Sequence, residues 1–475
     1  MLFCSLEFLA FFAALLLIYW LLPWHQARIW LLLAASFYFY AVWNTWLAVL
    51  IGVTTVMDYA VALGMDNSAS AWRRKLLLGV SLAVNLGVLC YFKYANFFLQ
   101  SLAQTLHALG ASASLPLLKV ILPIGISFYT FEAINYTVDV YRRKVPAERN
   151  LGYFLLFILF FPHLVAGPIV RARDFLPQIR RRKRFSWPRM HLGAQFFFLG
   201  LIKKLAVADR MALYVDPVFA DPRACGAATI WLAVIGYALQ IYCDFSGYTD
   251  MAIGAAHMLG YKLARNFDIP YVSANVSEFW RRWHISLSSW LRDYLFIPLG
   301  GSRGGGWTTY RNLMITMTLG GLWHGASWTF VVWGVLHGTL LIVHKAFAEF
   351  CKYRPVLDRV LQSLPGTLLR VMLTFVSVCV GWVFFRATTF AGAATLLRRM
   401  TAFHDATAGA PMPGVGISAT IAVVIVCHLI RRFDLWRKWY VQFPAPMLGF
   451  CYAAAVSLAL FLAPMGNKPF IYFQF

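Results

Sequence analysis

About a dozen long apolar stretches run through this chain, and they constrain its fold more than any other feature. A helix needs about 20 predominantly apolar residues to cross a bilayer, and many of the stretches approach or exceed that length. Only 13% of the 475 residues are charged and 60% are hydrophobic, whereas about a quarter of the residues in soluble domains are charged. We therefore expect an all-α, polytopic integral membrane protein. The stretches fall at 8–22, 29–41, 46–64, 76–101, 117–140, 151–168, 192–212, 227–258, 313–346, 368–390, 416–430 and 444–464.

The excess of basic residues indicates which ends of these stretches face the cytoplasm. The chain has 42 Lys and Arg against 19 Asp and Glu, a formal net charge of +23. In a soluble protein this excess suggests nucleic acid, but in a multi-pass protein Lys and Arg concentrate in cytoplasmic loops. Basic residues at 28, 73–75 and 142–144 agree with an outward-facing N-terminus and alternating helices. We predict membrane lipids as partners and no nucleic acid, and we interpret the basic run 180–184 as a contact with anionic lipid or with a partner protein.

Alternation fails at two places, which predicts elements that enter the membrane without crossing it. The stretch 151–168 has basic clusters on both sides and ends in a run with two prolines. The stretch 313–346 is also flanked by basic segments and contains Gly320, Gly321 and Gly325 near its middle. We expect a re-entrant element in the first case and a hairpin or broken helices in the second. With these, we predict about 11 to 13 membrane segments in one domain, residues 1–475, whose C-terminal helices follow residue 390.

Several kinds of site are not indicated by the sequence. The eight cysteines form no C-x-x-C pair and no cluster with histidine, so we expect neither a disulfide framework nor a metal site. The G-x-S-x-G and H-E-x-x-H motifs are absent, which argues against a serine hydrolase or a zinc protease. We expect no bound cofactor. The first apolar stretch lacks a basic residue before it and a cleavage site after it, so we expect a retained helix.

Residues 275–297 have the pattern of an amphipathic helix at the cytoplasmic interface. Apolar residues recur every three or four positions, and arginines and serines occupy the other side. The pattern alone favours a surface helix that anchors the fold. His284, beside the tryptophans of this segment, makes a role in chemistry the competing interpretation.

His324 lies in the glycine-rich sequence G-G-L-W-H-G at 320–325, inside an apolar stretch. Ionisable groups within the membrane are costly and usually face the protein interior or a water-filled path. Imidazole can also take and return a proton near neutral pH. A structural histidine bonded to a backbone carbonyl is about equally plausible on this evidence. The glycines favour function, because they permit non-helical backbone and close approach of a substrate.

Other polar groups in apolar segments are weaker candidates. Ion pairing or helix capping is the simpler explanation for the carboxylates, and the surroundings of the histidines are less suggestive. The glycine-rich run 300–306 matches no phosphate-binding motif and is interpreted as a flexible cytoplasmic turn. These candidates are Asp244, Asp250, Glu132, Asp139, His163, His257 and His337.

Several of these segments together resemble the membrane-bound O-acyltransferase family, in particular its bacterial alginate O-acetyltransferase-like branch. The resemblance rests on W-R-R-W-H-I-S at 280–286, W-L-R-D-Y at 290–294 and G-L-W-H-G at 321–325. Supporting similarities are L-P-I-G-I-S-F-Y at 122–129, F-P-H at 161–163, A-G-P at 166–168, D-F-S-G-Y at 244–248, N-F at 266–267 and P-Y at 270–271. The matches run from about residue 1 to residue 390.

The resemblance implies a multi-helix membrane fold, an essential histidine and a second His or Asn on the interfacial element. These map onto His324, expected as general base, and His284, expected to position or polarise the donor thioester. The family implies acetyl-CoA or another cytoplasmic acyl thioester as donor. Trp283, Trp323, Arg281, Arg282 and Arg303 are expected at the donor or substrate, and Asp244 and Asp250 as supporting acids.

We therefore predict a bacterial inner-membrane O-acetyltransferase with periplasmic termini that acetylates an exported polysaccharide of alginate type. Its expected partners are periplasmic acetyl-relay or polysaccharide-acetylating proteins. Acetylation of cellulose or another cell-envelope polymer is an alternative. A secondary transporter, which also uses broken helices, and a scaffold subunit of a secretion complex are the competing functions.

Overall fold

The computed structural model describes residues 1–111, 115–402, 414–432, 444–462 and 470. Every regular element within those ranges is helical, which confirms the all-α prediction. The chain forms two compact units, Met1–Phe197 with Thr249–Ala264, and Phe198–Tyr248 with Arg265–Phe475. Helices α10 and α12 each contribute residues to both units.

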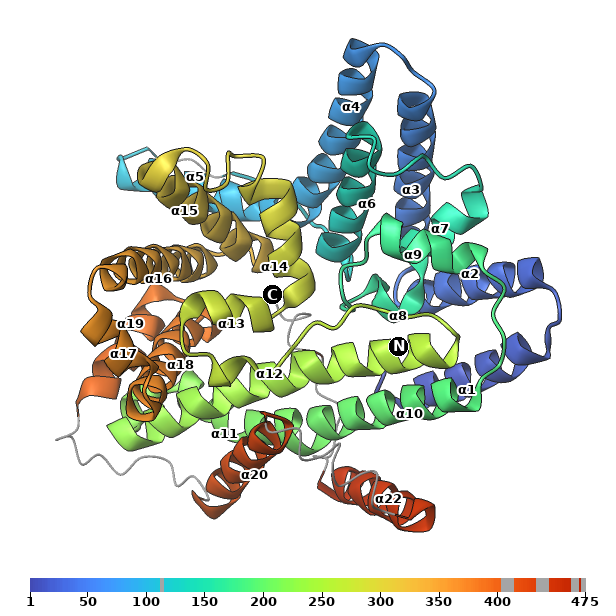
Figure 1. The fold of residues 1–475 in the computed structure, drawn as a ribbon. Helices are drawn as coiled ribbons and strands as arrows, with labels where there is room; N and C mark the ends of the chain where they lie inside the picture. Colours follow the sequence, from blue (N-terminus) through green and yellow to red (C-terminus); the bar gives the residue numbers. More distant parts are fainter. Residues whose placement is uncertain (112–114, 403–413, 433–443, 463–469, 471–475) are drawn as a thin grey trace. The chain divides into compact units, whose positions relative to one another are not determined.

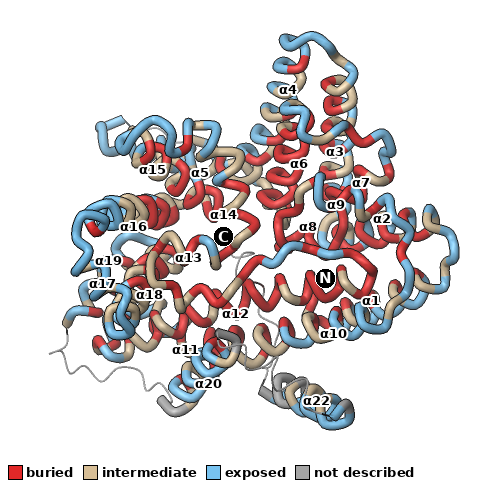
Figure 2. The backbone as a smooth tube through the Cα atoms, viewed as in Figure 1, coloured by how far each residue is buried: buried red, intermediate tan, exposed pale blue. Residues whose placement is uncertain are grey.

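The first unit is built around α6, which is buried along nearly its whole length (Figure 2). Polar N-caps start several of its helices; Ser5, Asn44 and Ser70 accept hydrogen bonds from the first turns of α1, α3 and α4. A π-helical turn, η1, joins α4 to α5, where the helical run bends (Figure 1). The elements are α1 Leu6–Leu21, α2 His25–Ala41, α3 Thr45–Asp66, α4 Ala71–Leu89, η1 Cys90–Tyr94, α5 Ala95–Ala108, α6 Ile126–Tyr141, α7 Leu151–Leu159, α8 Phe161–Leu164, α9 Ala172–Arg180 and α10 Trp187–Ile202.

The second unit holds most of α12 and the helices that follow it. Helix α15 packs along α16, and α16 packs against α18. The elements are η2 Lys203–Ala208, α11 Asp209–Ala220, η3 Pro222–Ala224, α12 Ala227–Met258, η4 Pro270–Val272, α13 Val276–Arg282, α14 Ile285–Leu291, η5 Arg292–Phe296, α15 Gly305–His324, α16 Trp328–Lys352, α17 Pro355–Gln362, α18 Leu364–Arg386, α19 Phe390–Thr401, α20 Gly414–Arg432 and α22 Ala445–Leu462.

Five helical segments of the described chain are long and apolar enough to cross a membrane. They are Thr45–Asp66, Ala71–Ala108, Ala227–Met258, Trp328–Lys352 and Leu364–Arg386. Large apolar side chains such as Trp46, Leu76 and Leu368 are exposed on three of them, as expected for helices in contact with lipid. The total of 11 to 13 segments stays a prediction.

The two segments predicted to return to the same side of the membrane consist of a short helix and a helical hairpin. Helix α7 has 9 residues, and at about 1.5 Å per residue it is far too short to cross a hydrocarbon core of about 30 Å. Helices α15 and α16 form the predicted hairpin, and His324 is the last residue of α15 before the turn.

The prediction of one continuous amphipathic helix at 275–297 is wrong in one respect. The segment divides into α13, α14 and the π-helical turn η5, with a break at Trp283 and His284. His284 has a φ of 43°, in the left-handed region, which no helical residue adopts. The predicted apolar face is nevertheless buried, at Phe279, Trp283, Leu287 and Trp290.

Candidate active site

The α15–α16 hairpin places His324, and glycines make its close packing possible. A Cβ atom on Gly321 would lie 2.3 Å from the Phe330 carbonyl oxygen, and one on Gly334 would lie 2.4 Å from the Met317 carbonyl oxygen. A Cβ on Gly325 would lie 2.2 Å from the Phe330 ring. The expectation that Gly321 and Gly325 leave room for a substrate is therefore wrong, because the space beside them is filled by α16.

Asn266 holds the break that contains His284. Its backbone carbonyl accepts a hydrogen bond from the Ile285 N–H at 2.9 Å. Its side-chain Oδ1 lies 3.1 Å from the Ser286 N–H nitrogen, 3.0 Å from the Ser286 hydroxyl and 3.2 Å from His284 Nδ1. A left-handed conformation is unfavourable for histidine by about 1–2 kcal/mol, and these bonds stabilise it. Backbone strain of this kind is common at functional sites.

The same contacts determine which nitrogen of His284 carries the proton. A backbone N–H can only donate, so the Asn266 atom facing Ser286 is the oxygen and not the amide nitrogen. An amide oxygen only accepts, so Nδ1 of His284 must donate to it. Burial lowers the pKa of His284, which lies outside the five candidate spans, to about 3. The neutral ring therefore carries its lone pair on Nε2.

The two histidines lie in one aromatic cluster. Their ring centroids are 6.4 Å apart, and the side chains are 0% and 3% exposed for His284 and His324 respectively. The His284 ring meets Phe245 of α12 edge-on at 4.7 Å. The His324 ring meets Trp333 of α16 at 5.0 Å and Phe385 of α18 at 5.3 Å. The structure thus brings together, in a buried site, the two histidines that the sequence singled out.

The tryptophans of the two motifs differ in their distance from the histidines. Trp323 lies 6.0 Å from the His284 ring and 5.0 Å from the His324 ring, between centroids. Trp283 is fully buried and packs on Trp382 at 5.0 Å, as a core residue does.

His337 of α16 belongs to the same cluster. Its ring centroid lies 4.7 Å from that of Trp333, and its Nδ1 accepts a hydrogen bond from Trp280 Nε1 at 3.3 Å. This histidine was only a weaker candidate from the sequence, because its own neighbours carry no motif.

The three candidate arginines are differently placed. Arg281 and Arg303 are exposed. Arg282 forms an ion pair with Glu278 at 2.9 Å, which makes it the least available of the three. No group of three or more His, Cys, Asp or Glu side chains suited to a metal ion occurs among the residues the structure describes.

Asp244 has a structural partner. It lies 2.8 Å from the Lys204 ammonium, which also lies 2.7 Å from Asp209, and all three residues are buried. Lys204 belongs to the π-helical turn η2, a feature that often marks functional sites. Asp250 is in the part of α12 that belongs to the first unit, so the two acids are not in one cluster within a unit.

The first unit contains a separate buried pair, His163 and Glu132. Nδ1 of His163 lies 3.1 Å from Glu132 Oε1, which also accepts a hydrogen bond from the Val170 N–H at 2.9 Å. The pair joins α6 to the short helix α8 and the loop after it. This agrees with ion pairing and capping, the simpler explanation offered for these residues.

Asn266, Trp333 and Phe385 are residues of the site that sequence reasoning missed. Asn266 precedes His284 by 18 positions, and Phe385 lies on a different helix. Asn266 stands in the N-F segment that supported the family resemblance, at 266–267, but a polar residue in a loop carries no pattern that links it to a distant histidine.

Comparison with known proteins agrees with this geometry. Residues 4–384 match the model of the membrane-bound O-acyltransferase family. A protein of Azotobacter vinelandii named probable alginate O-acetylase AlgI is 42% identical over 453 residues, covering 93% of this chain and 86% of the relative. A protein of the same name from Pseudomonas aeruginosa is 40% identical and covers 93% of this chain and 83% of the relative. A peptidoglycan O-acetyltransferase of Helicobacter pylori is 36% identical, covering 79% and 74%.

The family match covers both histidine motifs and the first four candidate spans completely. It covers the fifth span, Leu364–Arg386, as far as residue 384. The chain therefore belongs to the membrane-bound O-acyltransferase family and is a multi-pass membrane O-acyltransferase.

Proposed function

We propose that this enzyme transfers acetyl groups from a cytoplasmic thioester, acetyl-CoA, to hydroxyl groups of an exported polysaccharide of alginate type. The observation that carries the chemistry is the pairing of His284 and His324 in one buried aromatic cluster. The alginate O-acetylases similar to this chain at about 40% identity support the choice of acyl group and polymer. Acetylation of peptidoglycan, as the name of the Helicobacter relative states, is the second candidate.

His324 acts as general base in this proposal. Its neutral imidazole takes the proton of the acceptor hydroxyl while the hydroxyl oxygen attacks the thioester carbonyl carbon. The C–S bond then breaks, and the imidazolium returns the proton to the departing thiolate. Burial of the site limits hydrolysis of the thioester during the transfer.

His284 positions a reacting group in this proposal. The proton on Nδ1 is donated to Asn266, so Nε2 offers an acceptor and not a donor. Of the two roles expected for His284, positioning fits this tautomer. Polarising a carbonyl oxygen would require a donated proton, and burial disfavours a protonated ring.

The donor phosphates are assigned to the exposed guanidinium groups of Arg281 and Arg303. Both are expected on the cytoplasmic side by the distribution of basic loops. We propose the inner membrane as the location, with both termini in the periplasm and periplasmic proteins that receive or use the acetyl group. Labelling of single introduced cysteines from each side of intact cells tests this topology.

Replacement of His324 with alanine tests the proposed chemistry. In a host that secretes the polymer, the acetyl content should fall to the level of a strain without the enzyme, while the protein stays in the membrane at normal amounts. His428→Ala is the matched control, because His428 is a buried histidine that bonds to Val424 of its own helix. Unchanged acetylation in His324→Ala would contradict the proposal. Transfer of label from acetyl-CoA by purified wild-type protein separates an enzyme from a scaffold or transporter.

A further inference from the structure

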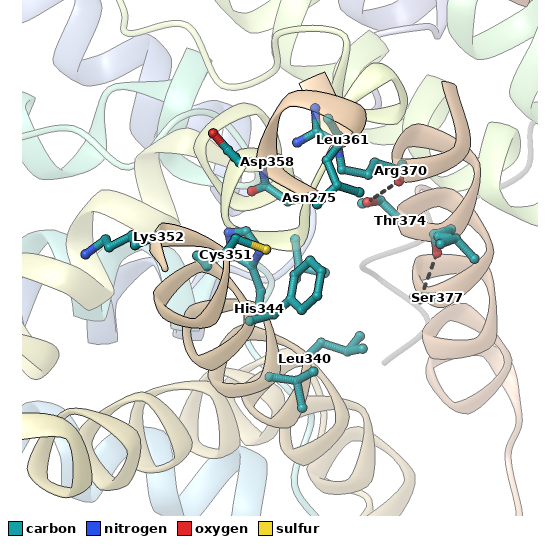
Figure 3. A pocket seen from close by; sticks show the side chains of 16 residues that line it. Asn275, Leu340, His344, Cys351, Lys352, Asp358, Leu361, Arg370, Thr374 and Ser377 are labelled. Atoms are coloured by element: carbon teal, nitrogen blue, oxygen red, sulfur yellow. Dashed lines mark hydrogen bonds between the residues drawn. The ribbon is translucent and has the colours of Figure 1, made fainter. Parts of the chain in front are cut away.

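A pocket of about 370 Å³ lies within the second unit, away from both histidines of the active site. Its walls come from α16, α17, α18 and the start of α13 (Figure 3). Pockets that bind small molecules typically have volumes of about 300–1,000 Å³ and combine apolar walls with a few polar groups. This pocket has that composition, with Val343, Phe347 and Leu361 among the apolar residues and His344 and Arg370 among the polar ones.

Arg370 is the unexplained charge in this pocket. Among the described residues, its side chain makes one hydrogen bond, a long contact of 3.4 Å with the Thr367 hydroxyl. Its Nε is buried without a partner, and no carboxylate of the described chain lies within 4 Å of the guanidinium. The pocket's other strong cation, Lys352, is paired with Glu349 at 2.9 Å. A partly buried guanidinium without an anion is costly unless a ligand supplies one.

The other charges at the pocket favour an anion. His344, Lys352 and Arg370 line the pocket and can each carry a positive charge. Asp358 is the one acidic residue in the lining, and its carboxylate accepts a hydrogen bond from Gln362 at 2.6 Å. A guanidinium binds phosphate through two parallel N–H donors, so phosphate is the group that best suits Arg370.

The mouth of the pocket indicates that the phosphate belongs to a lipid. Val343 and Phe347 of α16 and Leu373 of α18 line the pocket and are 58%, 45% and 54% exposed. A free nucleotide gains little from such a surface, whereas acyl chains bury it. Arg354 and Arg359 lie in the chain between α16 and α18. By the positive-inside rule they place this end of the two helices on the cytoplasmic side, where anionic lipids are abundant.

We propose that this pocket binds the headgroup of an anionic phospholipid of the cytoplasmic leaflet, with Arg370 holding the phosphate. The acyl chains then lie along Val343, Phe347 and Leu373. This site is separate from the acyl-transfer site and does not depend on the proposed function.

Native mass spectrometry of the purified full-length protein tests the proposal. The protein in detergent is titrated with dihexanoyl phosphatidylglycerol, dihexanoyl phosphatidylcholine, coenzyme A and inorganic phosphate in separate arms. We expect phosphatidylglycerol to bind, and Arg370→Gln to weaken it by at least tenfold. Arg359→Gln, which removes an exposed arginine outside the pocket lining, should bind as the wild type does.

A second variant controls for the case in which Arg370→Gln misfolds. Leu361→Trp fills the pocket and leaves Arg370 in place, so it should also abolish binding while helicity and monodispersity are retained. Phosphatidylglycerol binding that survives both substitutions overturns the proposal. Equal or tighter binding of coenzyme A or inorganic phosphate overturns the assignment to a lipid.

Discussion

Replacing Asn266 with leucine tests whether one amide oxygen fixes the state of His284. Leucine has a similar size but accepts no hydrogen bond, so the buried donors of Ser286 and His284 lose their acceptor. A buried donor left unsatisfied costs about 1–3 kcal/mol. His284 can escape this cost by moving its proton to Nε2, so we expect a net loss of about 2–4 kcal/mol in unfolding free energy.

The same replacement should change turnover in the folded fraction. The bond from Nδ1 to Asn266 is worth about 1 kcal/mol, which shifts the tautomer equilibrium about fivefold. We therefore expect kcat to fall about fivefold or more with little change in the KM for acetyl-CoA. Asn266→Asp keeps all three accepted bonds and should recover turnover near neutral pH. Its carboxylate also raises the pKa of His284, so an acidic limb should appear in the pH profile.

Transfer of labelled acetyl groups by protein in liposomes, measured against pH and corrected for the folded fraction, is the assay. Asn312→Leu is the matched control, since Asn312 is equally buried in the same unit and bonds to the Gly301 carbonyl instead. It should lose stability without a change in the pH profile. Wild-type kcat and an unchanged pH profile in Asn266→Leu would refute the tautomer argument.

Three further predictions concern packing, buried charge and acid stability. Gly321→Ala should lower the free energy of unfolding by about 1–3 kcal/mol or more and abolish activity, because the new Cβ meets the backbone of α16. Gly306→Ala, whose Cβ meets nothing within 4 Å, is the control in thermal unfolding. Lys204→Met should lower the free energy of unfolding by about 3–5 kcal/mol, because it removes the ammonium between two buried carboxylates. Lys352→Met, at an exposed ion pair, should leave the unfolding midpoint unchanged. Equal effects of the two substitutions would contradict this reasoning. Unfolded His284 takes up a proton below about pH 6.5, whereas the pKa of folded His284 is about 3. Between these two values the unfolded state binds more protons than the folded state. The free energy of unfolding should therefore fall by up to about 1.4 kcal/mol per pH unit as the pH drops through this window. His284→Asn should show a shallower fall, and the same slope in both proteins would argue against a buried neutral histidine.

Local pattern in the sequence was sufficient to predict much of the fold of this protein. Apolar runs longer than a soluble core requires determine an all-helical membrane chain, because backbone groups in lipid must bond within the helix. Basic residues on both sides of 151–168 and 313–346 identified the short helix α7 and the α15–α16 hairpin. The rarity of ionisable groups in apolar segments singled out His324, and periodicity identified the buried face that contains Trp283.

Only the tertiary structure decided how these parts form a site. The break at His284 depends on bonds from Asn266, 18 residues earlier, and helical periodicity carries no information about such a contact. The role of the glycines near His324 depends on which side of α15 meets α16, and Phe385 reaches the site from α18. Membrane insertion and helix formation follow from local composition, whereas tautomer, ring contacts and the unpaired Arg370 follow from packing between distant segments.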